Sequence, residues 1–558
     1  MFIRSRACFD VSRMSRHLGH RAPLLWLVLP LIAGLSLGKT LGGVSPRWLL
    51  CGAGVVAIFT AFAAWRWPRA WAPGVCVAMM LAGHAGYSLH RARLDAWEEL
   101  PAREAQLDLR VDRVFGQTEA RKASGLACVV RADPPLQELL GQRVYFSLML
   151  KPGESPPVRS AVISVLGVLA PLPRNPPVDT FDGYLAGAGM NFRLARGRVL
   201  ATERPASAYF RFCAAAADRF RKILGAGIAL KRPALAGLLR AMMLGETREL
   251  TEEQHALFMQ SGTMHLFAIS GLNIAVIAGA LQALLLPLRF SAWLRFAAGT
   301  VLLWLFVDIT GAAPSAVRAF GMATFLQAAL LLRRPANPLA AVTLSAFVVL
   351  LVAPLQIFSA SFLMSYAIVV ALLVLGLPLG ETWAAFWTPW RDVPAATLHR
   401  WQRIAAAAWR VTAAALAIGV ATALAGLITS VEFFQLLTPG ALVANLLLIP
   451  AAMLVTVGGF VALVCGLVGF SAGAVLCNHA SALVLLVIEH LVRVSVRLPG
   501  AFVSARFTAG WIGPAALAAL TLALLLGYAN GWRRQRGGFW PPFAIAAVTL
   551  IFGVKFGI

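Results

Sequence analysis

Residues 260–281 read QSGTMHLFAISGLNIAVIAGAL, a run that is apolar enough to lie in a lipid bilayer. Three polar side chains nevertheless stand in its first half, at His265, Ser270 and Asn273. The hydrocarbon of a bilayer offers them no hydrogen-bonding partner. The stretch therefore predicts a membrane helix that either bonds to neighbouring helices through these side chains or shows them to a wet cavity.

The composition of the whole chain is that of a polytopic α-helical membrane protein. Of its 558 residues, 59% are hydrophobic and 13% are charged, and the mean hydropathy is +0.75. Soluble domains carry about 25% charged residues. The net charge of +25 suits the basic cytoplasmic loops that orient membrane proteins. It also suits a polyanionic partner, so charge alone leaves both interpretations open.

Residues 1–90 predict N-terminal transmembrane helices, with apolar segments near 24–41, 48–65 and 71–90. By the positive-inside rule, the basic start of the chain and the basic loop after the second segment are cytoplasmic. Three crossings then deliver residue 91 to the outer face. The arginines concerned are Arg4, Arg6, Arg13, Arg16 and Arg21 in the start, and Arg66 and Arg69 in the loop.

Residues 91–205 form a long soluble stretch that predicts an inserted extracytoplasmic β-domain, with a short helix around 180–189. Five strands in this length fit a small closed barrel of the OB type, and other small β-domains fit nearly as well. OB barrels often bind single-stranded nucleic acid through a basic groove and stacked aromatics. Here the strands are short of exposed aromatics and acids nearly balance the arginines, so a purely structural domain is an equal alternative. The strand-like runs lie near 106–116, 126–132, 143–150, 161–169 and 191–201.

Residues 206–255 predict amphipathic helices at the membrane surface. The run YFRFCAAAADRFRKIL at 209–224 repeats apolar and basic residues at helical spacing. Thr251 and Gln254 are spaced as a capping box at the start of a further helix. The remaining chain then divides into a transmembrane domain over 256–530 and a basic loop with a final transmembrane helix over 531–558.

The opening stretch predicts two faces if its helix is continuous. At about 100° per residue, Asn273 lies ~80° and Ser270 ~140° around the axis from His265, so all three fit on one side. Small residues recur every four positions, which is a helix-packing pattern. Those packing residues are Gly271, Ala275 and Gly279.

A second polar spot is VDITGAAPSAVRAFGM, residues 307–322. Pro314 suits the first turn of a helix, Asp308 precedes the break and Arg318 lies one turn inside. Charges in apolar surroundings usually face a water-filled path or each other. A broken helix beside a charge is also how transport sites are built, and the alternative is a buried ion pair that fixes packing.

A third polar spot lies within residues 429–453, where helix-breaking residues interrupt apolar helices. Such breaks are tolerated in protein-lined interiors and not against lipid. The residues concerned are Glu432, Pro439, Gly440, Asn445 and Pro450.

The seven cysteines show no metal-ligand spacing, and Cys128 and Cys213 are candidates for a disulfide if their face is extracytoplasmic. The nine histidines include no His-x-His-x-Asp-His run, and there is no phosphate-binding loop. We therefore expect no cofactor, no metal and no enzymatic activity in this chain.

In these motifs the chain resembles the ComEC-type competence family, the inner-membrane channels for DNA uptake in naturally transformable bacteria. The resemblance runs over nearly the whole chain and implies passage of one DNA strand from the outer face, received by the OB-like domain. It also implies membrane lipid, a separate DNA receptor, a cytosolic translocase and a separate nuclease as partners. The motifs, in order, are NPPVDTFDGYLAGAGM, LLRAMMLGETREL, HLFAISGLN, TGAAPSAVRAFGM, SASFLMSYAIVVALL and TPGALVANLLLIP.

The sequence departs from this family's pattern in two ways. The family usually has His where this chain has Asn273, and an amide does not titrate near neutral pH. Many members also carry a C-terminal metallo-β-lactamase-like domain, and we expect this chain to be a form without it. The driving force would then come from a translocase or the proton gradient, and another protein would degrade the second strand.

The residues expected to line the DNA path are His265, Ser270, Asn273, Arg318 and Asp308. Two alternatives remain. One is a transporter of another anionic or amphipathic solute. The other is an intramembrane hydrolase that uses Ser270 with His265. These two residues are five positions apart, which on a single helix is a poor spacing for a direct hydrogen bond between their side chains.

Overall fold

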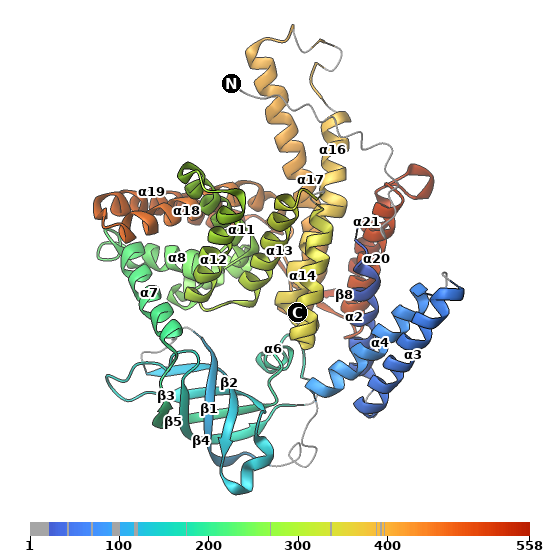
Figure 1. Ribbon diagram of the computed structural model, residues 1–558. Coiled ribbons are helices and arrows are strands. Elements are labelled where there is room, and N and C mark those ends of the chain that lie inside the picture. The colour runs from blue at the N-terminus through green and yellow to red at the C-terminus, as the bar shows by residue number, and fades with distance from the viewer. Residues whose placement is uncertain are drawn as a thin grey trace.

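A small β-barrel lies beneath a body of helices in the computed structural model (Figure 1). The arginine-rich start from Arg4 to Arg21, and Arg69, lie outside the described residues. The structure describes residues 22–41, 44–67, 71–91, 101–115, 121–173, 176–267, 269–334, 337–386, 388–390, 393–394 and 397–557.

Three N-terminal helices confirm the predicted apolar segments: α2 (Leu25–Thr40), α3 (Pro46–Arg66) and α4 (Trp71–His90). Helices α2 and α4 approach each other closely enough to exclude side chains at their contact. A Cβ atom on Gly34 would lie 1.9 Å from the carbonyl oxygen of Met80. This contact fixes α2 against α4.

The barrel closes in the order β1-β2-β3-β5-β4, and its neighbours are antiparallel except for β3 and β5. Alternate residues of β1 point inward, so Leu107, Leu109 and Val111 are almost fully buried in the barrel core. The five predicted strands and the short helix are confirmed. They are β1 (Arg103–Phe115), β2 (Lys122–Ala132), β3 (Arg143–Met149), β4 (Val162–Pro171), α6 (Phe181–Gly187) and β5 (Phe192–Arg204), with the 3₁₀ helix η2 (Pro134–Leu139) after β2.

Helices make up nearly all of the rest of the chain. The elements that follow β5 are α7 (Ala208–Gly225), α8 (Pro233–Leu244), η3 (Thr247–Glu249), α9 (Glu252–Gln260), α10 (Met264–Phe267), α11 (Gly271–Leu285), η4 (Leu286–Leu288), α12 (Ala292–Ile309), α13 (Pro314–Leu331), α14 (Pro338–Val352), η5 (Pro354–Phe358), α15 (Ala360–Ala371), η6 (Leu372–Gly376), α16 (Leu377–Phe386), α17 (Arg400–Phe434), α18 (Ala441–Leu467), α19 (Ser471–Arg497), α20 (Ile512–Ala529), η7 (Arg534–Arg536) and α21 (Trp540–Gly553).

Eight helical segments in the described part of the chain are long and apolar enough to cross a membrane: α3, α11 with η4, α12, α15 through α16, α17, α18, α19 and α20. The prediction of a multi-pass helical membrane protein with a small β-barrel is therefore confirmed. The largest apolar core lies among α7, α8, α11, α12, α18 and α19.

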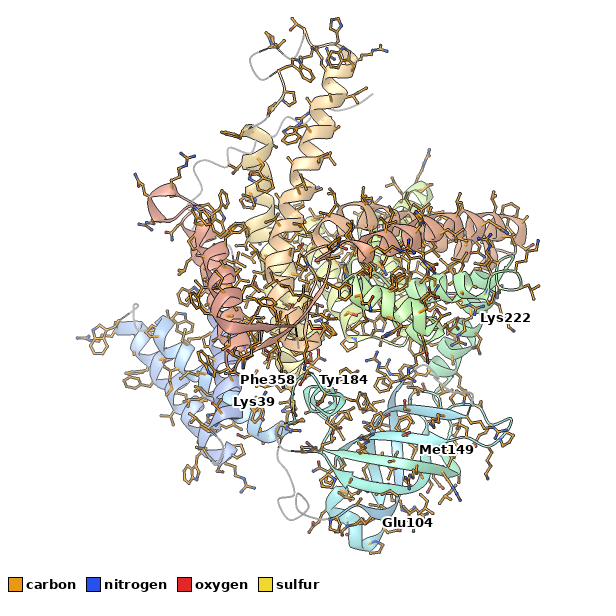
Figure 2. All side chains as sticks on the ribbon, turned by 180° about the vertical axis from the view of Figure 1, so that it is seen from behind. Lys39, Glu104, Met149, Tyr184, Lys222 and Phe358 are labelled. Carbon is orange, nitrogen blue, oxygen red and sulfur yellow. The ribbon has the colours of Figure 1, made fainter. Side chains whose placement is uncertain are left out.

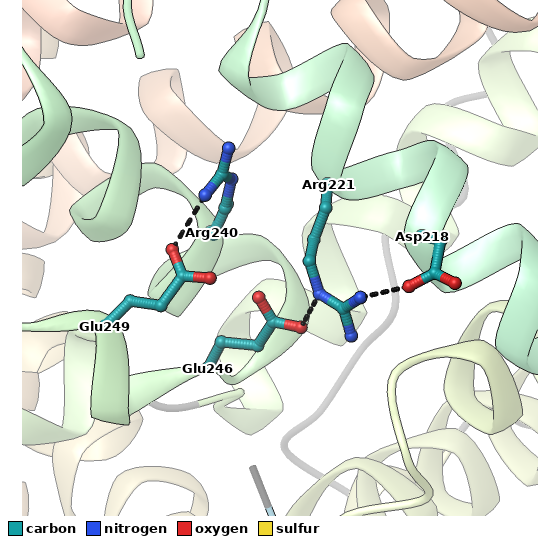
Figure 3. A network of polar contacts seen from close by, with 5 residues as sticks. All are labelled: Asp218, Arg221, Arg240, Glu246 and Glu249. Atoms are coloured by element: carbon teal, nitrogen blue, oxygen red, sulfur yellow. Dashed lines mark hydrogen bonds and ion pairs between the residues drawn. The ribbon is translucent and has the colours of Figure 1, made fainter. Parts of the chain in front are cut away.

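Polar contacts link the amphipathic helix α7, which follows the barrel in the chain, to the turn after α8 (Figure 3). Arg221 Nε donates to Glu246 Oε1 at 2.5 Å, and the same guanidinium pairs with Asp218. Nearby, Arg240 Nη1 lies 3.0 Å from Glu249 Oε2. Burial raises the pKa of the Glu246 carboxyl, and Arg221 opposes that shift. The network fixes α7 against the turn that follows α8.

Helix α9 begins at the predicted capping box. The Thr251 hydroxyl accepts from the Gln254 amide, and the Gln254 side chain accepts from the Thr251 amide, both at 3.2 Å. This reciprocal pair satisfies two backbone donors that the first turn leaves open.

Candidate functional site

A cavity of about 590 Å³ lies where the barrel meets the helices. Four arginines of the barrel line it, and Asp112 is a carboxylate among the lining residues. Its opposite wall includes Gln356, Ser359 and Ser361 of η5 and α15, beside the break between α12 and α13. The excess of cationic side chains suits an anionic ligand. The lining arginines are Arg110, Arg113, Arg143 and Arg159.

An ion pair beside the cavity joins the barrel to the end of α12. Arg159 Nη1 donates to Asp308 Oδ1 at 2.9 Å, and the Tyr209 hydroxyl donates to Asp308 Oδ2 at 2.7 Å. Burial raises the pKa of the Tyr209 hydroxyl, and its bond to Asp308 raises it further, so the phenol keeps its proton. The Arg159 guanidinium also lies 4.6 Å from the ring centre of Phe210. Asp308 therefore anchors the barrel to the end of α12.

Arg318 is held behind the helical wall of the cavity, with 1% of its surface exposed. It donates to the Ser361 carbonyl and hydroxyl oxygens at 2.6 Å, to Ser365 Oγ at 2.9 Å and to Gln356 Oε1 at 3.3 Å. All of these acceptors are neutral, and two of the residues that supply them, Gln356 and Ser361, also line the cavity. The alternative of an Asp308–Arg318 ion pair is wrong, because Asp308 is bonded to Arg159 and Tyr209 instead.

The first two polar spots meet at this wall. The chain turns between α12 and α13 with positive φ at Gly311 and Ala312, and Pro314 starts α13 as predicted. The Ser315 hydroxyl then donates to the Ile269 carbonyl oxygen at 2.7 Å. That carbonyl belongs to the interruption between α10 and α11, so two helix breaks support each other beside the cavity.

The opening stretch is not one continuous helix, which corrects the predicted shared polar face. Helix α10 ends at Phe267 and α11 begins at Gly271, because the Ser270 hydroxyl accepts from the Asn273 amide as an N-cap. His265 is exposed, and its Nδ1 lies 3.0 Å from the Gly262 carbonyl oxygen. Ser270 and His265 thus have separate partners.

Asn273 acts as a link between helices. It is 2% exposed, donates to the Met242 carbonyl oxygen at 3.2 Å and accepts from Thr456 at 3.4 Å. The structure therefore joins α8, α11 and α18 through this amide. His265, Ser270 and Asn273 are not among the residues that line the arginine cavity.

The predicted small-residue packing face of α11 is wrong within this chain. Gly271, Ala275 and Gly279 are exposed, whereas the bulkier Ile274 and Ile277 are buried. The side chains of Ile274 and Ile277 take the core side of this part of the helix.

The third polar spot lies where α17 gives way to α18, away from the cavity lining. Gly440 donates its amide to the Ala501 carbonyl oxygen at 3.1 Å, and Pro439 precedes it in the turn. Pro450 lies inside α18. The Asn445 Oδ1 atom is buried without a partner in the described part of the chain. A short sheet of β6 (Leu436–Leu437), β7 (Val503–Phe507) and β8 (Val554–Phe556) braces this turn.

Cys128 and Cys213 are both free, so the candidate disulfide is not formed. Cys128 lies on β2, and Cys213 lies on the buried side of α7 in the helical core. The thiols belong to different packing environments.

Sequence reasoning missed the four cavity arginines. Arg110 and Arg113 lie on β1, Arg143 begins β3, and Arg159 sits in the loop before β4. Each looks like an ordinary surface residue in its own segment, and only barrel closure brings the four together. The strands are short of exposed aromatics, as expected, but the helix α6 between β4 and β5 supplies Phe181 and Tyr184, which are 47% and 39% exposed.

Comparison with known proteins places the helical region in a family. The family described as Competence protein matches residues 242–531, just over half of the chain. The chain is 30% identical over 142 residues to ComE operon protein 3 of Bacillus subtilis (strain 168). That alignment covers 25% of this chain and 18% of the relative, so the chain matches well under two thirds of the relative's length. No solved structure matches the chain.

Proposed function

The chain belongs to the competence protein family, and from this premise we propose that it carries a single strand of DNA across the inner membrane of a bacterium. The arginine-lined cavity between barrel and helices carries the proposal. DNA brings one negative charge per nucleotide, and guanidinium groups bind phosphate oxygens through paired hydrogen bonds. The cavity is then the point where the strand passes from the barrel to the membrane helices.

The barrel supports this assignment by its form. OB barrels bind oligonucleotides on the face of strands 2 and 3 and with the loops after strands 1 and 4. In this chain the end of β1, the strand β3 and the connection that carries α6 meet at the arginine cavity. This overlap with the face that barrels of this kind use supports the proposal.

Arg318 adds to the positive potential of the cavity from behind its wall. A guanidinium buried among neutral oxygens is costly in a membrane protein, and such residues usually mark a path for a charged solute. Because two residues that hold Arg318 also line the cavity, its charge acts on whatever occupies that space.

The proposed topology places residues 91–205 outside the cytoplasm and the N-terminus inside it. The domains are then the N-terminal helices (1–90), the barrel, the amphipathic helices (206–255), the competence-type channel (256–530) and the final helix with its basic loop (531–558). A separate receptor would deliver DNA, a nuclease would degrade the second strand and a cytosolic translocase would pull the first.

The test removes charge from the cavity and follows both binding and uptake. The variant Arg110→Gln with Arg143→Gln takes two guanidiniums out of the lining, and Arg131→Gln with Arg198→Gln removes two exposed barrel arginines elsewhere. We expect the cavity variant to lower the slope of log affinity for single-stranded DNA against log salt by about 0.7 per lost phosphate contact. Labelled DNA should still reach the periplasm, but transformants should fall.

In the control variant, DNA uptake and the salt dependence of binding should stay closer to those of the parent protein than they do in the cavity variant. Equal loss in both variants would mean that only the net charge of the barrel matters. Normal transformation by the cavity variant would overturn the proposed path.

A further inference from the structure

Four aromatic side chains cluster beside the arginine cavity. Phe115 comes from the end of β1, Tyr145 from β3, and Phe181 and Tyr184 from α6. The ring centres of Phe181 and Tyr184 are 6.0 Å apart with nearly parallel planes, and Tyr145 meets Phe181 edge-on at 5.2 Å. Phe115 lies 6.4 Å from both tyrosines. We call these four rings the aromatic platform. Phe181 and Tyr184 are its exposed members, and the buried Tyr145 supports them.

The short helix α6 presents its part of the platform outward. Phe181 and Tyr184 are three residues apart and so lie on one side of the helix. On the other side, a Cβ atom at Gly183 would lie 2.1 Å from the Pro177 carbonyl oxygen, so the helix rests directly on the preceding loop. The Thr180 hydroxyl caps the first turn by accepting from the Gly183 amide at 3.1 Å. The helix is thereby held with both rings exposed.

Cationic groups border the rings. The Arg113 guanidinium carbon lies 5.4 Å from the ring centre of Phe115, and that of Arg193 lies 6.0 Å from Tyr145. Burial lowers the pKa of the Arg113 guanidinium, and the nearby Tyr184 raises it. Arg193 also faces Asp182 at 3.7 Å. Flat apolar surface alternates here with positive charge.

The platform opens toward the cavity. Tyr184 belongs to both the platform and the cavity lining, and Arg113, which borders the platform, also lines the cavity. Tyr184 lies on the side of the barrel that faces the helices, whereas Glu104 lies at its far end (Figure 2). A ligand that touches the exposed faces of Phe181 and Tyr184 therefore lies at the cavity entrance.

We propose that the two exposed rings of the aromatic platform, Phe181 and Tyr184, stack the unpaired bases of a DNA strand while the arginines of the cavity hold its phosphates. The inference rests on the proposed function, because it takes the DNA strand as the ligand. Stacking on aromatic rings accepts every base, which suits uptake of DNA of any sequence. A duplex hides its base faces, so the platform favours single strands at the entrance.

Full-length protein and fluorescent oligonucleotides test this inference. The three probes are a thymidine oligomer, an abasic oligomer of the same length and charge, and a hairpin duplex. The variant Phe181→Leu with Tyr184→Leu removes stacking and leaves every arginine in place. We expect it to bind the thymidine oligomer roughly tenfold or more weakly and the abasic oligomer as the parent protein does, with an unchanged salt slope.

Two further variants separate stacking from folding. Phe181→Trp keeps a flat ring and should retain or strengthen binding to the thymidine oligomer. Phe212→Leu removes another exposed ring, on α7, and should change nothing. Equal losses on the thymidine and abasic oligomers, or no loss at all, would overturn the platform and leave the charged path standing. If the parent protein bound none of the probes at low salt, the platform and the proposed function would both fail.

Discussion

At the scale of single residues, the polar side chains of the membrane region have two kinds of role. Some join helices through hydrogen bonds, and others carry a buried charge. Asn273 joins three helices by its amide, which is a packing role. Asp308 anchors the barrel, and Arg318 stands buried among neutral oxygens. The sequence predicted which residues were unusual, because charge in an apolar run is visible there. It did not predict their partners, which come from distant segments.

Arg318→Met tests whether this cation is kept for function. A buried charge without a countercharge costs stability, so we expect thermal unfolding of the variant in detergent to be unchanged or shifted upward. Transformation should fall by roughly tenfold or more, as for loss of one charge-assisted interaction. Arg318→Lys serves as the control that keeps the charge. A strongly destabilised Arg318→Met protein, or one with normal uptake, would contradict this role.

The Arg159–Asp308 pair should respond unequally to loss of either partner. Asp308 is nearly buried, whereas over a third of the Arg159 side chain is exposed. Removing the arginine leaves the buried Asp308 carboxylate without its countercharge. Removing the carboxylate leaves an arginine that water can solvate. We expect Arg159→Met to cost roughly 2 kcal/mol more in unfolding free energy than Asp308→Asn. Equal costs, measured by denaturant unfolding, would show that the pair is screened by water.

At the scale of elements, local patterns predicted most helices and all five barrel strands, since periodicity and turn residues are local properties. The break between α10 and α11 was missed because the apolar run continues across it. The signal that was present is Ser270, whose hydroxyl caps α11. The prediction of a small-residue packing face on α11 was wrong for a different reason. The spacing of the small residues does not show which face of the helix the bulkier isoleucines occupy.

Substitutions of Ser270 distinguish a helix-capping role of its side chain from a role as a nucleophile. Ser270→Ala should destabilise the protein by about 1 kcal/mol through loss of the N-cap. Ser270→Asn keeps a capping oxygen but has no hydroxyl, so we expect stability and DNA uptake close to the parent protein. Abolished uptake in a stably folded Ser270→Asn protein would instead favour the hydrolase alternative.

At the scale of the whole molecule, the arginine cavity and the aromatic platform exist only because the barrel closes and docks on the helices. The platform draws on Phe115, Tyr145 and Tyr184, from three separate elements. The opposite cavity wall comes from η5 and α15, far along the chain. No single segment carries the pattern of such a site. From the sequence alone, the barrel could be predicted only to belong to a kind that often binds nucleic acid.

The most direct test of the DNA path is photo-cross-linking during uptake in living cells. A photoreactive phenylalanine analogue replaces Tyr184 at the cavity entrance, and the same analogue at the exposed Glu104 marks the far end of the barrel. Labelled DNA is supplied and the cells are irradiated while transformation proceeds. We predict cross-links to single-stranded DNA from position 184 and far fewer from position 104. Normal transformation with no excess of cross-links at position 184 would contradict passage of the strand through this cavity.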